Sequence, residues 1–462
     1  MAGLNLRGDT SGSVEIVSPA VAGDNTITLP NDNGSANQFF KNSTTAGIVT
    51  HSSMVEDASG NIGIGTTVPT ETLHVVGDAR VTGILTVGTA SLTLNGADGT
   101  ITGINTINGL TYPSAGALSN RNKIINGEMR VAQHGTTAFP IGDDDYPTDR
   151  FLFSNAGTTD GGGTGIQTAT SPNGFSNALR VDVTSADTSL DASAQYKIEY
   201  RVEGLDSADL NWGTANAQTV TLSFYIRSNK TGNTSVALVN SANNRSYVKT
   251  FTIDSADTWE RKECTIPGDT SGTWLTSNSI GLRIRWGTYG SNFQTSSVNQ
   301  WNASQNMSTD DSPINFFDTV ANTLYLTGVQ LEVGERATPF EHRSYGDDLA
   351  RCQRYYYKLI ADSGRTFANG YNQNTRYTRN ILHFPVSMRI PPTALEQTGT
   401  PGNYRIYHGT TETACSGVPT LNSSTTNTAE IQADTGSGLS AGQGNALESN
   451  SNGTYLAFTA EL

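Results

Sequence analysis

Apolar and polar residues alternate along the middle of the chain, in short runs separated by Asn, Gly and Ser. The clearest runs cover residues 219–228, 234–240, 246–253, 259–267, 280–286 and 324–332. Alternation with a period of two places one side of a strand against a core and the other side toward solvent. We therefore expect residues 120–343 to form an antiparallel sandwich, with a jelly roll as the specific prediction.

The first quarter of the chain has too few bulky side chains for a conventional core. Up to residue 119 there is no Trp, and the only Phe and Tyr residues are Phe39, Phe40 and Tyr112. Short stretches of Val, Ile and Leu between residues 73 and 109 are punctuated by glycines. Such strands bury enough apolar surface only when several chains close around one axis, so we expect residues 59–119 to form a trimeric β-stalk. The alternative is a disordered linker.

A short helix and a second β-domain are predicted after the sandwich. Leu349, Cys352 and Tyr356 share one face of a helix within residues 344–360, which we assign as a linker. Residues 361–462 contain further strand candidates and predict a small β-sandwich; these candidates are residues 381–388, 404–408 and 454–462. The expected fold class is therefore all-β.

Composition and charge exclude several classes of protein. Only 15% of residues are charged and 48 are Gly, which suits turn-rich β-structure better than helix bundles. The net charge of −14 argues against a nucleic-acid partner, because such binding needs cationic contacts. Cys264, Cys352 and Cys415 lie far apart and give neither a disulfide framework nor metal-ligand spacing. No long apolar run is present, so we expect no membrane insertion.

Several segments resemble phage tail fibres. Residues 60–83 (GNIGIGTTVPTETLHVVGDARVTG) resemble the stalk repeat of such fibres, including those of phages of cyanobacteria. Two segments near residue 120 (NKIINGEMRVAQHG and YPTDR) and three near residue 340 (TGVQLEVG, ATPFEHRSY and CQRYY) resemble the boundaries of a fibre domain similar to jelly-roll carbohydrate-binding modules. Residues 384–389 and 458–462 resemble the terminal domain that follows it.

The resemblance implies a function, a set of partners and a location. It implies a homotrimeric tail fibre that attaches to other virion tail proteins through residues 1–58 and adheres to a host-surface polysaccharide or outer-membrane receptor. The expected location is the virion tail, with the host cytoplasm during assembly. Two alternatives stay open. One is a tail spike that degrades polysaccharide, and the other is a purely structural connector of the tail or capsid.

Aromatic residues in loop-like sequence are the candidates for glycan binding, because flat rings stack on the apolar faces of sugars. The candidates are Trp212, Trp286, Tyr289, Phe293 and Trp301, which lie among Gly, Ser and Asn. A core position for Trp286 is an equal alternative, and Trp259 and Trp274 are expected in the core. The polar loops 422–428 and 436–444 of the last domain are further candidates or plain hairpin ends.

No catalytic pattern stands out. Asp145 and Asp149, with their neighbours at 143 and 144, form the most obvious carboxylate cluster, and Asp310, Asp311 and Asp318 form a second one. Adjacent Asp residues in a turn point in different directions, so solvated loops are the first interpretation and a structural calcium site is the second. We expect no enzyme activity and no cofactor other than such a calcium ion.

Overall fold

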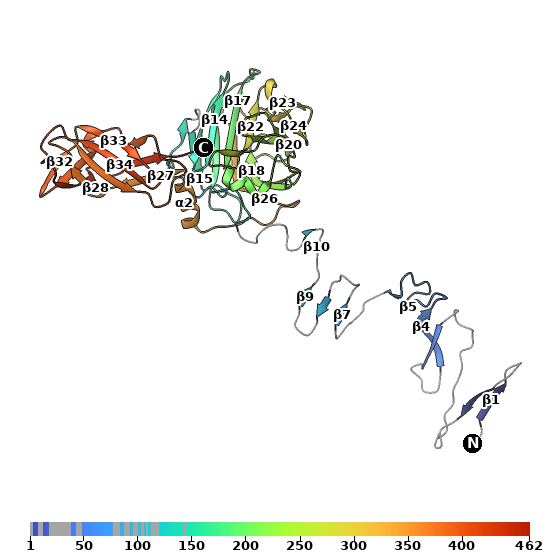
Figure 1. The fold of residues 1–462 in the computed structure, drawn as a ribbon. Coiled ribbons are helices and arrows are strands. Elements are labelled where there is room, and N and C mark those ends of the chain that lie inside the picture. The colour runs from blue at the N-terminus through green and yellow to red at the C-terminus, as the bar shows by residue number, and fades with distance from the viewer. Residues whose placement is uncertain are drawn as a thin grey trace. The chain divides into compact units, whose positions relative to one another are not determined.

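The computed structural model describes residues 52–76, 120–140, 142 and 145–462, and the backbone of further short strands before residue 112. Contacts within the chain define two compact units, residues 1–104 and 105–462. The described elements are almost all strands (Figure 1), and the α-helices among them are α1 (Gly204–Ser207) and α2 (Tyr345–Gln353). The prediction of an all-β protein is confirmed. No helix in the described part is long and apolar enough to cross a membrane.

The first unit consists of short strands in small sheets. One sheet has the order β3-β4-β5-β6, and another has the order β7-β8-β9. Their bounds are Gln38–Asn42, Val49–Glu56, Ile62–Ile64, Leu73–Val75, Ile84–Thr86, Thr93–Asn95 and Thr100–Thr102. Most of the range 77–119 lies outside the described residues. The trimeric stalk therefore stays a prediction.

Two packed sheets form the first of the two sandwiches in the second unit. Sheet A has the order β12-β15-β16-β26-β18-β21, with bounds Phe139–Pro140, Gly162–Thr168, Ala178–Ser185, Thr323–Val333, Val220–Ser228 and Glu260–Ile266. Sheet B has the order β13-β14-β17-β22-β19-β20-β24, with bounds Asp145–Thr148, Phe151–Ala156, Gln195–Glu203, Ile280–Tyr289, Gly232–Asn240, Ser246–Ile253 and Trp301–Asn302.

The order of the strands identifies this sandwich as a jelly roll. Eight strands, β16 to β22 and then β26, are divided between the sheets so that the order is β16-β26-β18-β21 in one and β17-β22-β19-β20 in the other. This interleaving is that of two Greek keys wrapped around one core. The jelly roll predicted from alternation is therefore confirmed, and strand β20 has the predicted bounds.

The core lies between the two sheets because alternate residues of each strand point inward. Phe224 and Ile226 of β18 in sheet A face Ile198 and Tyr200 of β17 in sheet B, and all four are at most 2% exposed. The residues between them point outward. The outward faces of sheets A and B are therefore the places where side chains can meet a ligand.

Helix α2 and the last domain follow the jelly roll. Ser344 caps α2, since its Oγ accepts a hydrogen bond from the Asp347 amide at 3.2 Å. The helix ends at Gln353, and β27 (Tyr356–Ala361) already pairs with β36 (Thr454–Thr459). The boundary expected at residue 361 is therefore wrong, because residues 356–360 belong to a strand of the last domain.

The last domain is a small β-sandwich, as predicted. Sheet C contains β27, β36 and β30 (Leu395–Gln397), in that order. Its partner, sheet D, has the order β32-β31-β35-β28-β29-β34-β33, with bounds Thr411–Ala414, Tyr404–His408, Gly444–Ser449, Thr366–Asn372, Thr378–His383, Thr428–Asp434 and Gly417–Ser424. The strand expected at 381–388 ends at His383, and Pro385 then lacks the amide that a ladder needs.

Candidate functional site

Two of the predicted site residues are buried. Trp286 and Tyr289 are each 1% exposed. Trp286 points into the jelly-roll core, where its ring lies edge-on to Phe224 with 5.6 Å between ring centroids. Tyr289 lies on the other side of sheet B in a cluster with Met307. Neither ring presents a face to solvent, so the structure places neither at a binding surface. Trp286 therefore occupies a core position, which was the alternative to a binding role.

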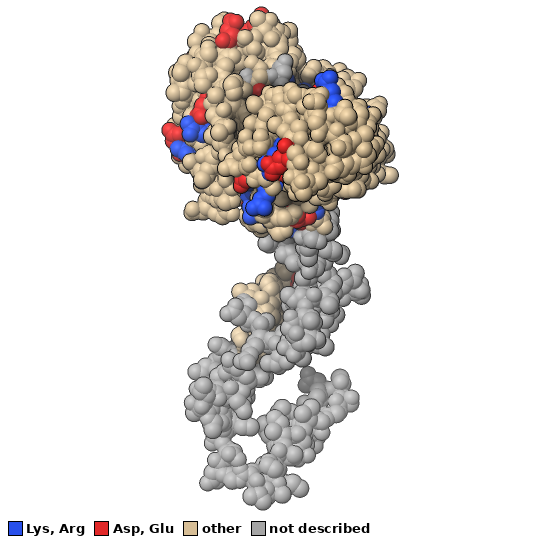
Figure 2. Space-filling view, turned by 90° about the vertical axis from the view of Figure 1, so that its left-hand side faces the viewer, with Lys and Arg blue, Asp and Glu red and all other residues tan. Residues whose placement is uncertain are grey.

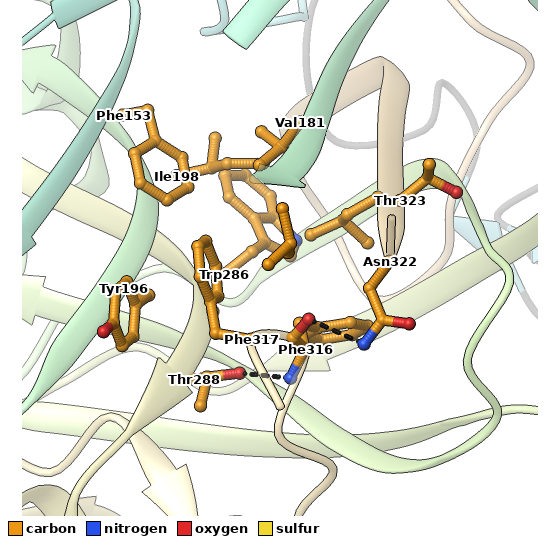
Figure 3. A pocket seen from close by; sticks show the side chains of 13 residues that line it. Phe153, Val181, Tyr196, Ile198, Trp286, Thr288, Phe316, Phe317, Asn322 and Thr323 are labelled. Atoms are coloured by element: carbon orange, nitrogen blue, oxygen red, sulfur yellow. Dashed lines mark hydrogen bonds between the residues drawn. The ribbon is translucent and has the colours of Figure 1, made fainter. Parts of the chain in front are cut away.

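A small cavity lies beside Trp286 within the core. Figure 3 shows the rings and aliphatic side chains that surround it, among them Phe153, Ile198 and Phe316. Its volume is about 10 Å³. A space of that size holds at most one water molecule. The cavity is a local feature of core packing and has no room for a sugar.

Two other predicted residues, Trp212 and Trp301, come together at one edge of the core. Their ring centroids are 5.3 Å apart, and Trp274 lies 4.8 Å from Trp212 and 5.4 Å from Trp301. The Trp212 indole N–H donates to the Gln218 carbonyl at 2.8 Å, and that of Trp301 donates to the Pro267 carbonyl at 2.8 Å. Trp212 and Trp274 line a pocket of about 230 Å³, but Trp212 is only 7% exposed. The three tryptophans mainly stabilise the fold.

The fifth predicted residue, Phe293, packs with a segment that covers part of sheet B. Phe293 and Val298 lie against Ala237, Val239 and Val248, which point outward from sheet B. Because the segment shields these apolar positions from solvent, Phe293 has a structural role. This part of the outward face of sheet B is therefore closed to a large ligand.

A buried ionic cluster occupies the neighbouring part of the same face. Glu199 accepts hydrogen bonds from Arg201 Nε at 2.6 Å and from Arg283 Nη1 at 2.7 Å, and it also pairs with Arg285. Burial alone would raise the pKa of Glu199, but the three guanidinium groups outweigh it and hold the pKa below its usual range. A carboxylate held in this way is ionised at neutral pH and does not act as a general acid.

The aspartates identified in the sequence do not form a metal site in the described residues. Asp143 and Asp144 lie outside those residues, and Asp149 is buried and accepts two hydrogen bonds from Gln133, each at 2.6 Å. Asp310 and Asp311 line a pocket of about 460 Å³, whereas Asp318 pairs with Lys230 elsewhere. No three His, Cys, Asp or Glu side chains of the described ranges lie close enough together to hold a metal ion.

The best candidate site lies on the outward face of sheet A. A groove of about 520 Å³ is lined by the rings of Phe175, Tyr225, Phe340 and His342. We call it the aromatic groove. Ring centroids are 5.3 Å apart for Phe175 and Tyr225, 5.1 Å for Phe175 and Phe340, and 5.0 Å for Phe340 and His342. Phe175 contacts each of the other three rings, and a connected group of four partly exposed rings is an uncommon feature of a protein surface.

Three separate parts of the chain bring these rings together. Tyr225 occupies an outward position on β18, between the inward Phe224 and Ile226. Phe175 comes from the loop before β16, where the Ser171 hydroxyl donates to its carbonyl at 2.7 Å. Phe340 follows β26, and the next amide, that of Glu341, donates to the Gln330 side chain at 2.8 Å. Each ring is thus held by an anchored backbone, as a preformed site requires.

A glycine makes the close approach of two rings possible. Gly328 of β26 has φ of +60° at a point where the register with β18 shifts. A Cβ atom there would lie 2.8 Å from Phe175 Cζ and 2.9 Å from Tyr225 Cδ2. Glycine alone lets both rings pack directly on the backbone in this left-handed conformation. The floor of the aromatic groove therefore depends on this position.

Polar groups surround the rings. Arg261 lies at the rim, where Nη2 donates to the Thr338 carbonyl at 3.2 Å. His342 Nδ1 lies 3.2 Å from Glu128, and the His342 side chain is 51% exposed. The hydroxyl of Tyr225 and the side-chain amide of Asn173 have no hydrogen-bond partner among the described residues. Rings flanked by free donors and acceptors are what recognition of a hydroxylated ligand needs.

The sequence analysis missed every member of the aromatic groove. Alternation within the predicted strand 219–228 places Tyr225 on the outward face, so its exposure could have been predicted. Phe175 and Phe340 lie far from it in the sequence and in no strand. Their proximity follows only from the order of the strands in sheet A.

Comparisons with known proteins identify no family. No protein-family model and no curated protein matches the sequence. Among solved structures, the enzymatically active domain of tailspike protein 4 from bacteriophage CBA120 is similar at 12% identity, with 46% of this chain and 21% of that chain covered and a TM-score of 0.25. The chain thus matches about a fifth of the tailspike structure.

Two sugar-binding structures are similar to the same extent. The family 11 carbohydrate-binding module of Clostridium thermocellum, in complex with a β-1,3-1,4-mixed-linked tetrasaccharide, is 10% identical over 44% of this chain and 100% of that chain, with a TM-score of 0.23. A putative sugar binding protein of Bacteroides thetaiotaomicron is 13% identical over 46% and 99%, with a TM-score of 0.24. Likeness at this level does not decide the function, which has to be argued from the site.

Proposed function

We propose that the jelly-roll domain binds a glycan in the aromatic groove, and that the chain is a receptor-binding fibre of a tailed phage. The contact between the rings of Phe175, Tyr225 and Phe340 beside unpaired polar groups carries the proposal. Aromatic faces stack on the apolar faces of sugar rings, and nearby amides and hydroxyls bind the sugar hydroxyls.

The role as a tail fibre is supported by the resemblance of residues 60–83 to a fibre stalk repeat. In the same stretch, Val68, Leu73 and Val76 are 72%, 60% and 58% exposed. Apolar side chains exposed in a single chain are expected to be covered when chains associate. A homotrimer would carry three aromatic grooves, and avidity would then strengthen adhesion to a repetitive host surface even if each site is weak.

Adhesion rather than cleavage is the proposed activity. Glu199, Asp149 and Asp318 are engaged in ion pairs or hydrogen bonds. Near the aromatic groove, Glu128 and Glu332 are engaged with His342 and Thr338, so neither is a free member of the carboxylate pair that glycoside hydrolysis uses. Attachment to other tail proteins through the N-terminal segment and a location on the virion tail complete the proposal. A polysaccharide-degrading spike and a structural connector are the alternatives that the following experiment separates.

The test is affinity electrophoresis of the full chain in gels that contain envelope polysaccharide extracted from a panel of cyanobacterial strains. Retardation by at least one extract is expected for the wild type. The double variant Tyr225→Ala/Phe340→Ala should bind at least tenfold more weakly, because two stacking surfaces are lost. Tyr345→Ala is the matched control, since Tyr345 is 49% exposed and lies outside the aromatic groove.

Each outcome bears on one hypothesis. Equal retardation of the double variant and the wild type would contradict the aromatic groove as the binding site. The absence of retardation in every extract would favour a structural connector. Release of new reducing ends from the extract would show a degrading spike. Thermal unfolding of each variant excludes misfolding as the cause of lost binding.

A further inference from the structure

A second surface suited to a sugar chain lies on the last domain, on the outward face of sheet D. Neighbouring strands of this sheet place Tyr407 beside Ala446, Ala446 beside Asn369, and Asn369 beside Ile381. The residues between them along the strands, such as Ile406, Leu447 and Leu382, point into the core. Side chains of paired residues share one face of a sheet, so this row faces solvent.

Two exposed tyrosines on this face flank a strand with small outward side chains. Tyr407 of β31 is 41% exposed and Tyr371 of β28 is 53% exposed. Between these strands runs β35, whose outward residues next to the two tyrosines are the small Ala446 and Gly444. We call this surface the tyrosine trough. Strands β31 and β28 are two strand spacings apart, which corresponds to about 10 Å.

The floor of the tyrosine trough is open. A Cβ atom built on Gly444 would meet no atom closer than 3.9 Å, the carbonyl oxygen of Gly370. Gly370 of the neighbouring strand β28 is closely packed by contrast, since a Cβ there would lie 1.8 Å from the Arg379 carbonyl oxygen. Gly444 therefore leaves space above the strand that no part of the described chain fills.

The charged residues of this face neutralise one another. Arg379 pairs with Glu430 at 2.8 Å, and Arg405 pairs with Glu448 at 3.0 Å and with Glu412 at 2.7 Å. The tyrosine trough lies between these two groups of ion pairs. On the surface visible in Figure 2, acidic and basic side chains are likewise few and mostly adjacent to one another. A surface of this kind complements a neutral ligand better than an ionic one.

Free hydrogen-bonding groups accompany the rings. The hydroxyls of Tyr371 and Tyr407 and the exposed side-chain amide of Asn369 have no hydrogen-bond partner among the described residues. These groups lie beside the open floor. Their combination with two exposed rings is the same chemistry as in the aromatic groove, built from a different set of elements.

We propose that the tyrosine trough is a second glycan-binding site, which takes a neutral oligosaccharide across β35. The two rings would stack on different sugar units of one chain, and Asn369 would bind hydroxyls between them. The apolar part of the surface is small compared with the roughly 800 Å² per partner that a stable protein interface buries. A sugar chain therefore fits it better than a protein. This proposal extends the proposed function to a second domain but depends on its own residues.

The experiment uses the full chain and four hexasaccharide probes: β-1,4-linked glucose, β-1,3-linked glucose, β-1,4-linked xylose and, as the acidic control, α-1,4-linked galacturonic acid. Isothermal titration gives affinity and the number of sites per chain. Tyr371→Ala/Tyr407→Ala should weaken binding of at least one neutral probe at least tenfold. Ala446→Leu should do the same by filling the floor while both rings stay in place. Tyr345→Ala should leave binding unchanged.

The outcomes separate this proposal from the first. Loss of binding in Tyr371→Ala/Tyr407→Ala but not in Tyr225→Ala/Phe340→Ala would assign the probe to the tyrosine trough and support this proposal. Loss in Tyr225→Ala/Phe340→Ala alone would assign the probe to the aromatic groove and contradict this proposal. Binding of no neutral probe by the wild type, or of the acidic probe alone, would overturn the proposal. If native mass spectrometry shows that Tyr371→Ala/Tyr407→Ala changes the number of chains in the assembly, the face is a contact between copies, and the proposal is overturned.

Discussion

Replacing Arg150 with Met should destabilise the junction between the jelly roll and the last domain. The guanidinium of Arg150 is buried, lies 3.5 Å from the ring centroid of Tyr355, and pairs with Glu461. Its Nη2 also donates to the carbonyl of Arg201 at 2.7 Å. Arg150 thus connects the start of β14 with Tyr355, between α2 and β27, and with Glu461 at the end of the last domain.

The expected loss follows from what the substitution leaves behind. The Glu461 side chain is 8% exposed and would lose its nearest cation. Removing one partner of a buried ion pair costs about 3 to 5 kcal/mol, because the other charge stays desolvated. The lost cation–π contact and the lost hydrogen bond to the Arg201 carbonyl act in the same direction, but such contributions are not additive. We expect a loss of about 3 to 5 kcal/mol in total.

Urea unfolding followed by two probes measures this loss. All five Trp residues, at positions 212, 259, 274, 286 and 301, belong to the jelly roll, so Trp fluorescence reports that domain alone. Circular dichroism reports both domains. In the wild type the two transitions should coincide, whereas in Arg150→Met the dichroism should show an earlier transition of the last domain. Arg376→Met is the control, because it removes a surface ion pair with Asp434, in which the Arg376 side chain is 50% exposed, and should shift the unfolding midpoint far less.

A double variant tests whether the unpaired Glu461 carboxylate causes the loss of stability. Arg150→Met/Glu461→Gln removes both charges and should recover most of the lost stability, since the cost arises from the unpaired carboxylate. A loss below about 1 kcal/mol in Arg150→Met, or no recovery in the double variant, would contradict the assigned role of the ion pair. Coincident transitions in Arg150→Met would show that Arg150 does not couple the two domains.

Two further predictions concern pH and the groove. Burial raises the pKa of Asp149 to about 7, although the hydrogen bonds from the Gln133 side chain and amide lower it. The pKa in the folded protein thus exceeds the unfolded value of about 3.9. The free energy of unfolding should therefore fall by up to about 4 kcal/mol as the pH rises from about 4 to 7. Burial lowers the pKa of His134 to about 3, so His134 makes the protein less stable as the pH falls below about 6.5. Because both proteins contain His134, the difference in unfolding free energy between Asp149→Asn and wild type reports Asp149 alone. A difference that does not change with pH would refute the raised pKa of Asp149. Gly328→Ala should cost about 1 to 3 kcal/mol and weaken glycan binding, since a Cβ there meets both Phe175 and Tyr225; unchanged binding in the electrophoresis assay would argue against a groove floor at this position.

Much of the fold was readable from the sequence because alternation is a local signal. The strands at 246–253 and 404–408 have their predicted bounds, and the two predicted sandwiches are both present. The end of the linker helix was not readable, because three consecutive tyrosines from Tyr355 to Tyr357 suit a helix face and a strand equally well. Only pairing with β36 decides that Tyr356 starts a strand.

The site could be predicted only in kind. Aromatic residues in polar surroundings are also the class of side chain that lines the aromatic groove, but exposure is a property of the folded chain. Strand β22 continues to Tyr289, three residues beyond the predicted strand, and this extension buries Tyr289, which the sequence places in a loop. The aromatic groove combines Phe175, Tyr225 and Phe340, whose contacts depend on strand order and on the bulge at Gly328. No local pattern records such long-range contacts.

The most direct test of glycan binding in the aromatic groove is a crystal structure of the chain soaked with the oligosaccharide that binds it most tightly. The account predicts electron density for sugar rings stacked on Tyr225 and Phe340, with hydroxyls near Asn173 and Arg261. Sugar density confined to the tryptophan pocket near Trp212 and Trp274, or density absent from the aromatic groove at saturating oligosaccharide, would contradict it.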